Sequence, residues 1–178
     1  MIKRELSEVE ASVLGLVWHD GPSTPYAIRK VFLGSPNPTW SGSAGTIYPL
    51  IERLIIRKLI RSTPCSTGKR QGHKISLTEP GKRALQKWLA IPIPDWVAGI
   101  PPDPLRTRIR FLGALDPKGQ RAFVNAAIHQ AEVHLWAVQA DCERRQPIGG
   151  FPFLMARGTL LSMQSRCAFL AEVAAAMR

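Results

Sequence analysis

The sequence predicts a mainly α-helical protein with one small β-hairpin, and three observations support this. Apolar residues recur at helical spacing over most of the 178 residues. Residues 59–77 instead contain two strand-like segments around a polar turn. Five prolines then crowd residues 92–104 and form a stiff connector. We therefore expect an N-terminal unit over residues 1–90, a connector over 91–104 and a helical unit over 105–178.

Capping residues mark the first two helices. Ser7 followed by Glu10 is the pattern of a capping box, in which each residue satisfies a backbone N–H of the other. The first helix should begin there and end at the Asp-Gly-Pro sequence of residues 20–22. Ser23 or Thr24 can cap a short second helix, because proline follows in its first turn.

The third helix opens at Ser41 or Ser43 and carries an apolar stripe from Ile47 to Ile55. Two strands should follow, at residues 59–63 and 74–77, with a glycine-containing turn at 66–72 between them. A fourth helix should start near Thr78 and end near Leu89. Three helices, a hairpin and a helix form the order of a winged helix-turn-helix, whose third helix enters the DNA major groove while the wing touches the backbone.

The charge distribution agrees with a polyanionic partner. Lys and Arg total 24 against 13 Asp and Glu, which gives a net charge of +11. Between Glu52 and Glu79 there is no acidic residue, yet seven basic residues fall there. A local field of one sign favours phosphate binding. The alternative is a solvated basic surface.

We expect DNA contacts from the side of the third helix opposite its apolar stripe, from the neighbouring second helix and from the wing. Small, hydroxyl-bearing or cationic side chains there can reach bases and phosphates. The candidates are Tyr26, Ser41, Ser43, Thr46, Tyr48, Pro49, Arg53, Arg57, Lys69, Arg70 and Lys74. The alternatives are a core position for Tyr48, a structural kink at Pro49, a solvated turn for the wing tip and solvated charges for the arginines.

Three helices are expected in the C-terminal half, over residues 105–115, 117–145 and 153–177. The last carries a heptad seam, which indicates a partner helix. The predicted interface residues are Phe153, Leu160, Met163, Cys167, Leu170, Ala174 and Met177. A self-dimer would pair two recognition helices, as two-fold DNA sites require. The alternative is packing on the preceding long helix of the same chain.

Other chemistry finds little support. Cys65, Cys142 and Cys167 are widely spaced and form neither a disulfide framework nor a zinc motif. His129 and Glu132 share a helix face, but two residues are a weak basis for a metal site. We see no phosphate loop, nucleophile elbow or paired carboxylates, and expect no cofactor and no catalysis. Without a signal peptide or an apolar run of about 18 residues, we expect a cytoplasmic protein away from membranes.

Several segments of the N-terminal unit resemble the PadR family of bacterial transcriptional regulators. The matching segments are residues 14–28, 40–54, 59–60 and 75–81. The string Gly-Thr-Ile-Tyr-Pro at residues 45–49, before a Leu-rich helix, is the specific element. The resemblance covers roughly residues 6–90 by motif and the rest by layout. The chain departs from the family at Ile75, where tyrosine is usual, and at Pro25, where glycine is common.

The resemblance implies a winged helix domain, a helical dimerisation domain and repression of promoters, often relieved by a small aromatic or hydrophobic effector. We therefore expect a sequence-specific regulator whose partners are a double-stranded DNA operator, a second copy and a small aromatic effector. Trp88, Trp96 and Trp136 are candidates for the effector site, with core packing as the alternative. A winged helix module that docks to a protein is the competing function, and a small enzyme lacks a visible nucleophile–base set.

Overall fold

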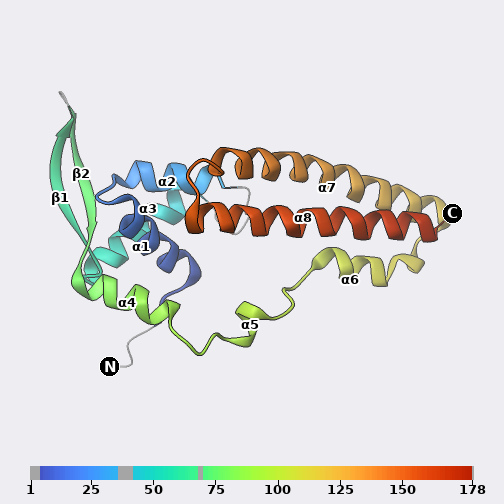
Figure 1. Cartoon of the computed structure of the whole chain (residues 1–178), viewed down its shortest axis with the longest axis horizontal. Coiled ribbons are helices and arrows are strands. Elements are labelled where there is room, and N and C mark those ends of the chain that lie inside the picture. The colour runs from blue at the N-terminus through green and yellow to red at the C-terminus, as the bar shows by residue number, and fades with distance from the viewer. Residues whose placement is uncertain (1–4, 36–41, 68–69, 178) are drawn as a thin grey trace. The chain divides into compact units, whose positions relative to one another are not determined.

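The structure is a computed structural model of the chain, described here for residues 5–35, 42–67 and 70–177 (Figure 1). It is mainly helical and carries one two-stranded antiparallel hairpin, so the predicted fold class is confirmed. The chain forms two compact units, residues 1–100 and 101–178. No helix of the described ranges is both long and apolar enough to cross a bilayer.

The first unit has the predicted order of three helices, a hairpin and a helix. Its elements are α1 (Glu8–Asp20), α2 (Pro25–Leu33), α3 (Ala44–Ile56), β1 (Ile60–Thr67), β2 (Arg70–Leu77) and α4 (Glu79–Leu89). One apolar cluster draws on all of them and consists of Val13, Leu14, Val17, Ile28, Phe32, Ile47, Leu50, Ile51, Leu54, Leu59, Ile60, Ile75 and Leu85. The apolar stripe of α3 is therefore buried, and its opposite side is left for other contacts.

The predicted caps form at α1 and α2. The backbone N–H of Glu10 donates to Ser7 Oγ at 3.3 Å, and that of Ser7 donates to Glu10 Oε2 at 3.0 Å. Thr24 Oγ1 accepts from the N–H of Ala27 at 3.1 Å. In α3 the interior proline, Pro49, does not end the helix. Proline has no N–H, so position 49 cannot donate the hydrogen bond that another residue would make in the helix.

The wing is longer than predicted. β1 and β2 pair from Ile60 opposite Leu77 to Thr67 opposite Arg70, so the strands take in most of the turn expected over residues 66–72. The strands continue to pair through their backbone groups, and this pairing does not require apolar side chains. A prediction from apolar periodicity therefore misses this part of the wing. The N–H groups of Ser23 and Ile75 also exchange hydrogen bonds with each other's carbonyls, at 3.1 and 2.8 Å. This bridge ties the wing to the start of α2.

The connector region contains one short helix, α5 (Asp95–Ala98), before the second unit begins at residue 101. That unit comprises α6 (Pro104–Arg110), the 3₁₀ turn η1 (Leu112–Ala114), α7 (Pro117–Arg145) and α8 (Gly150–Ala176). The helix expected over residues 105–115 is thus shorter, because the chain tightens into η1.

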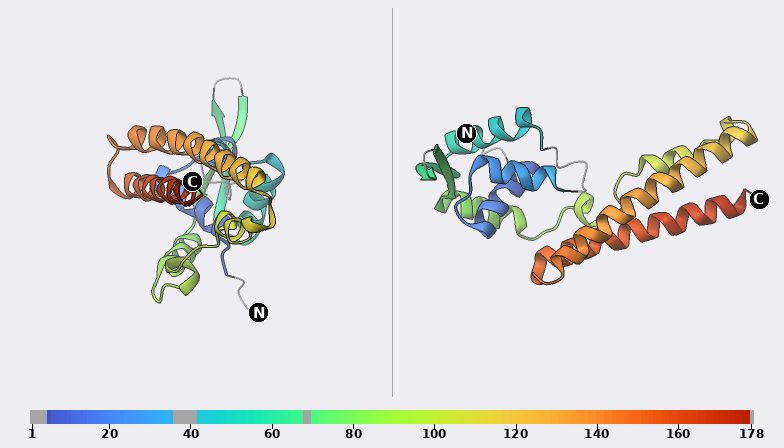
Figure 2. Two further views of the ribbon diagram at one scale, coloured as in Figure 1. Left: turned by 90° about the vertical axis from the view of Figure 1, so that its right-hand side faces the viewer. Right: turned by 90° about the horizontal axis from the view of Figure 1, so that it is seen from above.

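α7 and α8 form a long antiparallel hairpin whose helices lie side by side (Figures 1 and 2). The reversal occurs at Gly149 and Gly150, which have φ values of 67° and 60°. This left-handed backbone favours glycine, which has no Cβ to clash. The helix break expected near these residues is confirmed, although α8 starts three residues earlier than the predicted Phe153.

Candidate nucleic-acid interface

The N-terminal end of α3 presents hydroxyl groups to solvent. Ser43 is the N-cap residue, and its carbonyl accepts from the N–H of Thr46 at 3.1 Å. The two side-chain hydroxyl oxygens lie 2.7 Å apart, and both residues are exposed. Each hydroxyl can donate and accept, so the pair retains capacity for a further partner. Tyr48 and Pro49 are also exposed, so Tyr48 does not belong to the core.

The two arginines of α3 have different surroundings. Arg53 is exposed. Arg57 is the C-cap residue, its side chain is 30% exposed, and its Nη1 lies 3.1 Å from Oε1 of Glu10. The side chain of Glu10 is only 1% exposed, and its other oxygen accepts the N–H of Ser7. One buried carboxylate therefore joins the start of α1 to the end of α3.

A second junction fixes the end of α3 to the wing and to α4. Lys58, with a φ of 58°, turns the chain out of α3. The hydroxyl oxygen of Thr78 lies 2.7 and 2.9 Å from the carbonyl oxygens of Lys58 and Leu59, and it accepts from the N–H of Gly81 at 3.1 Å. A Cβ at Gly81 would lie only 1.9 Å from the Leu59 oxygen. The wing therefore ends at a fixed place relative to α3.

Other candidate residues lie around this frame. Tyr26 is exposed on α2, and Lys74 is exposed on β2 opposite Thr63. Ser41 and Lys69 lie outside the described residues, as does the side chain of Arg70. The wing also exposes Arg61 and His73, which were not among the candidates. The acid-free basic stretch pointed to Arg61, whereas nothing in the sequence distinguished His73.

The predicted dimer seam of α8 faces α7 in its first half. Phe153, Leu160 and Met163 pack with Val138 and Cys142 of α7. Leu170 is fully buried, while Cys167, Ala174 and Met177 are partly buried. Intramolecular packing, the alternative to a self-dimer, therefore uses this side of α8. The seam's role between two copies stays a prediction.

The opposite side of α8 is apolar but exposed. Phe151, Leu154 and Leu161 recur at intervals of three and seven residues, a spacing that places them on one helix face. Gly158 lies between them, and a Cβ there would meet nothing within 4 Å. An α-helix that is apolar on two opposite sides normally has neighbours on both. The heptad pattern identified only the side that α7 covers.

The three candidate effector tryptophans are not core residues. Trp88 is 40% exposed on α4 and Trp96 is 68% exposed on α5, both in the first unit. Trp136, in the second unit, is 76% exposed on α7. All three cysteines are free. Within the described ranges, no three His, Cys, Asp or Glu residues are grouped so that they could hold a metal ion.

We compared the sequence and the fold with those of known proteins. No family profile and no curated protein matches the sequence. Among solved structures, that of Bacillus subtilis PadR in complex with operator DNA has a TM-score of 0.81 at 20% identity, covering 98% of this chain and 100% of that one. A PadR-like regulator from Bacillus cereus gives 0.76 at 15% identity, covering 100% of both chains.

This chain has the PadR fold. The virulence activator AphA of Vibrio cholerae also shares it, with a TM-score of 0.73 at 17% identity over 96% of this chain and 98% of that one. The resemblance seen in the N-terminal motifs thus extends, as a fold, over nearly the whole chain. It includes the C-terminal PadR helices, where the sequence matched only by layout.

Proposed function

We propose that the protein is a sequence-specific, DNA-binding transcriptional regulator. The observation that carries this proposal is the exposed hydroxyl and basic side of α3, held in a fixed position beside a basic wing. The operator complex of Bacillus subtilis PadR, which has the same fold, supports it. Such a regulator acts in the cytoplasm, where its DNA target lies.

In this proposal α3 enters the major groove and the wing contacts the backbone. Ser43 and Thr46 read base edges, because their hydroxyl groups can donate and accept. Arg53 and Lys74 contact phosphates, because their charged side chains are exposed on the same unit. Arg57 lies at the edge of this surface, where Glu10 restrains its guanidinium group.

Binding to a duplex from the chain's own upstream region, compared with a scrambled duplex, tests the proposal. If about 6–10 phosphates are neutralised, affinity should fall about 10³–10⁵-fold between about 50 and 200 mM salt. Arg53→Ala and Lys74→Ala should each reduce the salt slope by about one. Lys118→Ala, which removes the same charge from exposed α7, is the matched control. Equal affinity for both duplexes would contradict sequence-specific binding.

We also propose that the protein acts as a homodimer joined by its helical unit. A palindromic operator needs two recognition helices, and each chain supplies one α3. The exposed apolar face of α8, defined by Phe151, Leu154 and Leu161, supports this proposal because such a face is costly to leave in water. The seam that begins at Phe153 would support the same interface from within each chain, by holding α8 on α7.

Finally, we propose that the protein is a repressor that a small aromatic or hydrophobic effector releases. A crystal structure of Bacillus subtilis PadR contains p-coumaric acid. In this chain a hollow of about 310 Å³ lies between α6, η1 and α7. Phe111, Leu115 and Phe123 contribute to its largely apolar lining, and the three exposed tryptophans lie elsewhere. A ligand at either place acts only if it prefers one state of the dimer.

Titration with a panel of aromatic acids tests effector release, with tryptophan emission and operator release followed together. A coupling of about 1–3 kcal/mol would weaken operator binding about 5–150-fold. Trp136→Phe should remove the change in emission if the ligand lies near that indole, whereas Phe111→Ala should remove release if the hollow is the site. Emission changes without release would contradict a switch, and no response at all would contradict the ligand.

A further inference from the structure

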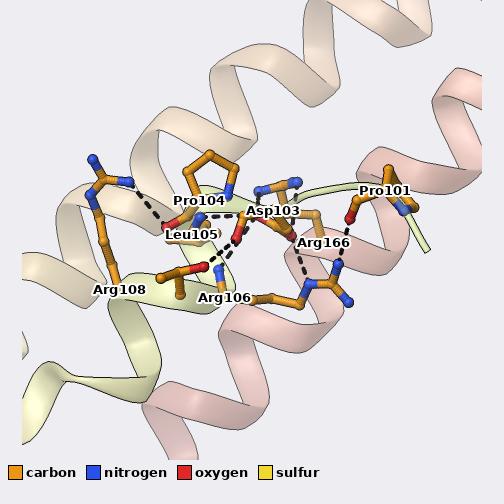
Figure 3. A network of polar contacts seen from close by, with 8 residues as sticks. Pro101, Asp103, Pro104, Leu105, Arg106, Arg108 and Arg166 are labelled. Carbon is orange, nitrogen blue, oxygen red and sulfur yellow. Dashed lines mark hydrogen bonds and ion pairs between the residues drawn. The ribbon is translucent and has the colours of Figure 1, made fainter. Parts of the chain in front are cut away.

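At the start of the helical unit, an ion pair joins Asp103 to α8. Asp103 precedes α6, and both of its carboxylate oxygens face the guanidinium group of Arg166, in the second half of α8 (Figure 3). Nη1 of Arg166 lies 3.2 Å from Oδ1, and Nη2 lies 3.1 Å from Oδ2. Two parallel N–H···O bonds of this kind fix orientation as well as distance. The pair joins residues that are 63 positions apart.

The same carboxylate organises the start of α6. Asp103 Oδ1 accepts the N–H groups of Leu105 and Arg106 at 2.9 and 3.4 Å. The side chain of Arg106 returns to Asp103, with Nε 3.3 Å from Oδ2, and its Nη2 donates to the carbonyl of Pro101 at 2.8 Å (Figure 3). Residues 101–106 are therefore held to α8 by one network, which we call the Asp103 clamp.

The residues that lead up to Asp103 have exposed side chains. Every residue from 86 to 102 is exposed, including the large apolar side chains of Ile91, Trp96 and Ile100. The first side chain after this stretch that is not exposed is Asp103 itself. Prolines stiffen the connector, so its direction at the clamp is carried some way along the chain. The clamp is thus the point at which the connector becomes fixed to the helical unit.

We propose that Asp103 and Arg166 are positioning residues for operator binding, because they fix where the connector leaves α8. This proposal rests on the proposed dimeric DNA-binding function. In a dimer, the second half-site binds at an effective concentration set by the length and stiffness of the link between the two binding units. A clamped connector restricts the half-site separations that one dimer can bind. A released connector tolerates more separations and binds the best one less tightly.

The clamp is separate from the packing that holds the helical hairpin together. That packing consists of apolar contacts between α7 and α8 around Val138, Cys142 and Leu160. Asp103 and Arg166 do not belong to this cluster, so changing them should leave the hairpin intact. The first unit, which we call the winged unit because it carries the hairpin wing, contains neither residue. It should therefore keep its affinity for a single half-site.

The test uses the full chain with Asp103→Asn and with Arg166→Lys. Asparagine keeps the capping ability of position 103 and loses the charge, while lysine keeps the charge and loses the bidentate geometry. Arg157→Lys, an exposed arginine on α8, is the matched control. The probes are a palindromic duplex selected from random DNA by the wild-type protein, versions with about one to four base pairs inserted between the half-sites, and one half-site alone.

We expect both variants to bind the single half-site like the wild type, within about twofold. At the preferred spacing they should lose about tenfold or more in affinity, and the inserted duplexes should differ less from one another. A wild-type spacing profile in both variants would overturn the clamp and leave the regulator intact. An equal loss on the single half-site would also overturn it. A wild-type protein without spacing preference would overturn the two-site mode of binding together with the clamp.

Discussion

The winged unit and the helical unit differ in how their buried apolar residues are grouped. In the winged unit, one cluster unites α1 to α4 and both strands. In the helical unit, the buried cluster centres on Val138, Cys142, Ala156 and Leu160, while Phe151 remains 86% exposed on the other side of α8. The one cluster of the winged unit fixes α3, whose opposite side carries the exposed hydroxyl groups of Ser43 and Thr46. In the helical unit, the exposed apolar face of α8 lies opposite the buried cluster and indicates a further protein surface.

The largest effect should follow from placing charges on the exposed face of α8. Leu154→Asp with Leu161→Asp should yield monomer and weaken operator binding about 10²–10⁴-fold, because the second half-site no longer binds from the same particle. Sedimentation gives the mass and a mobility assay gives the affinity. Leu154→Ala with Leu161→Ala, which adds no charge, is the control. A dimer that survives both aspartates would place the interface elsewhere and remove the proposed contrast between the units.

The next largest effect should come from breaking the ion pair between the buried Glu10 and the partly exposed Arg57. Arg57→Met removes the cation beside the buried Glu10 and should destabilise the unit by about 3–5 kcal/mol. Adding Glu10→Gln should recover part of this loss, because glutamine is neutral and still suits the capping box. Urea denaturation measures both. Equal stability of Arg57→Met and the wild type would contradict a structural role for this pair.

Core truncation compares the two units directly. Leu54→Ala, in the closed core, should cost about 2–5 kcal/mol through lost burial and the cavity left behind. Leu154→Ala, on the exposed face of α8, should change the stability of a monomer by less than about 0.5 kcal/mol. Denaturation at low protein concentration keeps dimerisation out of the measurement. Similar costs at the two positions would show that the face of α8 is covered within one chain.

Loss of a single base contact should have a smaller effect, confined to the winged unit. Ser43→Ala or Thr46→Ala should alter the preferred sequence, with about 1–3 kcal/mol lost for each base contact. Competition among duplexes with single base changes measures this. Lys74→Ala should instead weaken all duplexes about equally, because phosphates carry no sequence information. If the serine or threonine variant weakened every duplex equally, α3 would contact the backbone at that position.

The smallest effect concerns pH and the helical unit. Burial raises the pKa of Asp103, but the N–H of Leu105 and the charge of Arg166 outweigh this, so the pKa lies below its ordinary value of 3.8. The ionised carboxylate therefore stabilises the folded state above pH 3.8, and this stabilisation is lost as the pH falls through the lowered pKa. The melting temperature of the wild type should drop more between pH 5 and 2.5 than that of Asp103→Asn. Parallel curves would contradict the assignment.

The sequence predicted features that depend on neighbouring residues. The Ser7–Glu10 capping box, the bounds of α7 and the break before α8 were all readable, because each follows from local capping, periodicity or glycine. The pairing of Arg57 with Glu10 was not, because it joins residues 47 positions apart and an arginine in a basic stretch looks like a phosphate ligand. The apolar spacing of α8 predicted a partner helix but could not identify which helix covers which side.

Gly81 lies at a position where the fold accepts no side chain. Any side chain there would collide with the Leu59 carbonyl, whose oxygen lies 1.9 Å from the Cβ position. In the proposed function, Ser43 or Thr46 can therefore be exchanged for residues that prefer another DNA sequence, while the junction of α3, wing and α4 stays fixed. Under that proposal, the preferred DNA sequence could change without any change in the fold that presents α3.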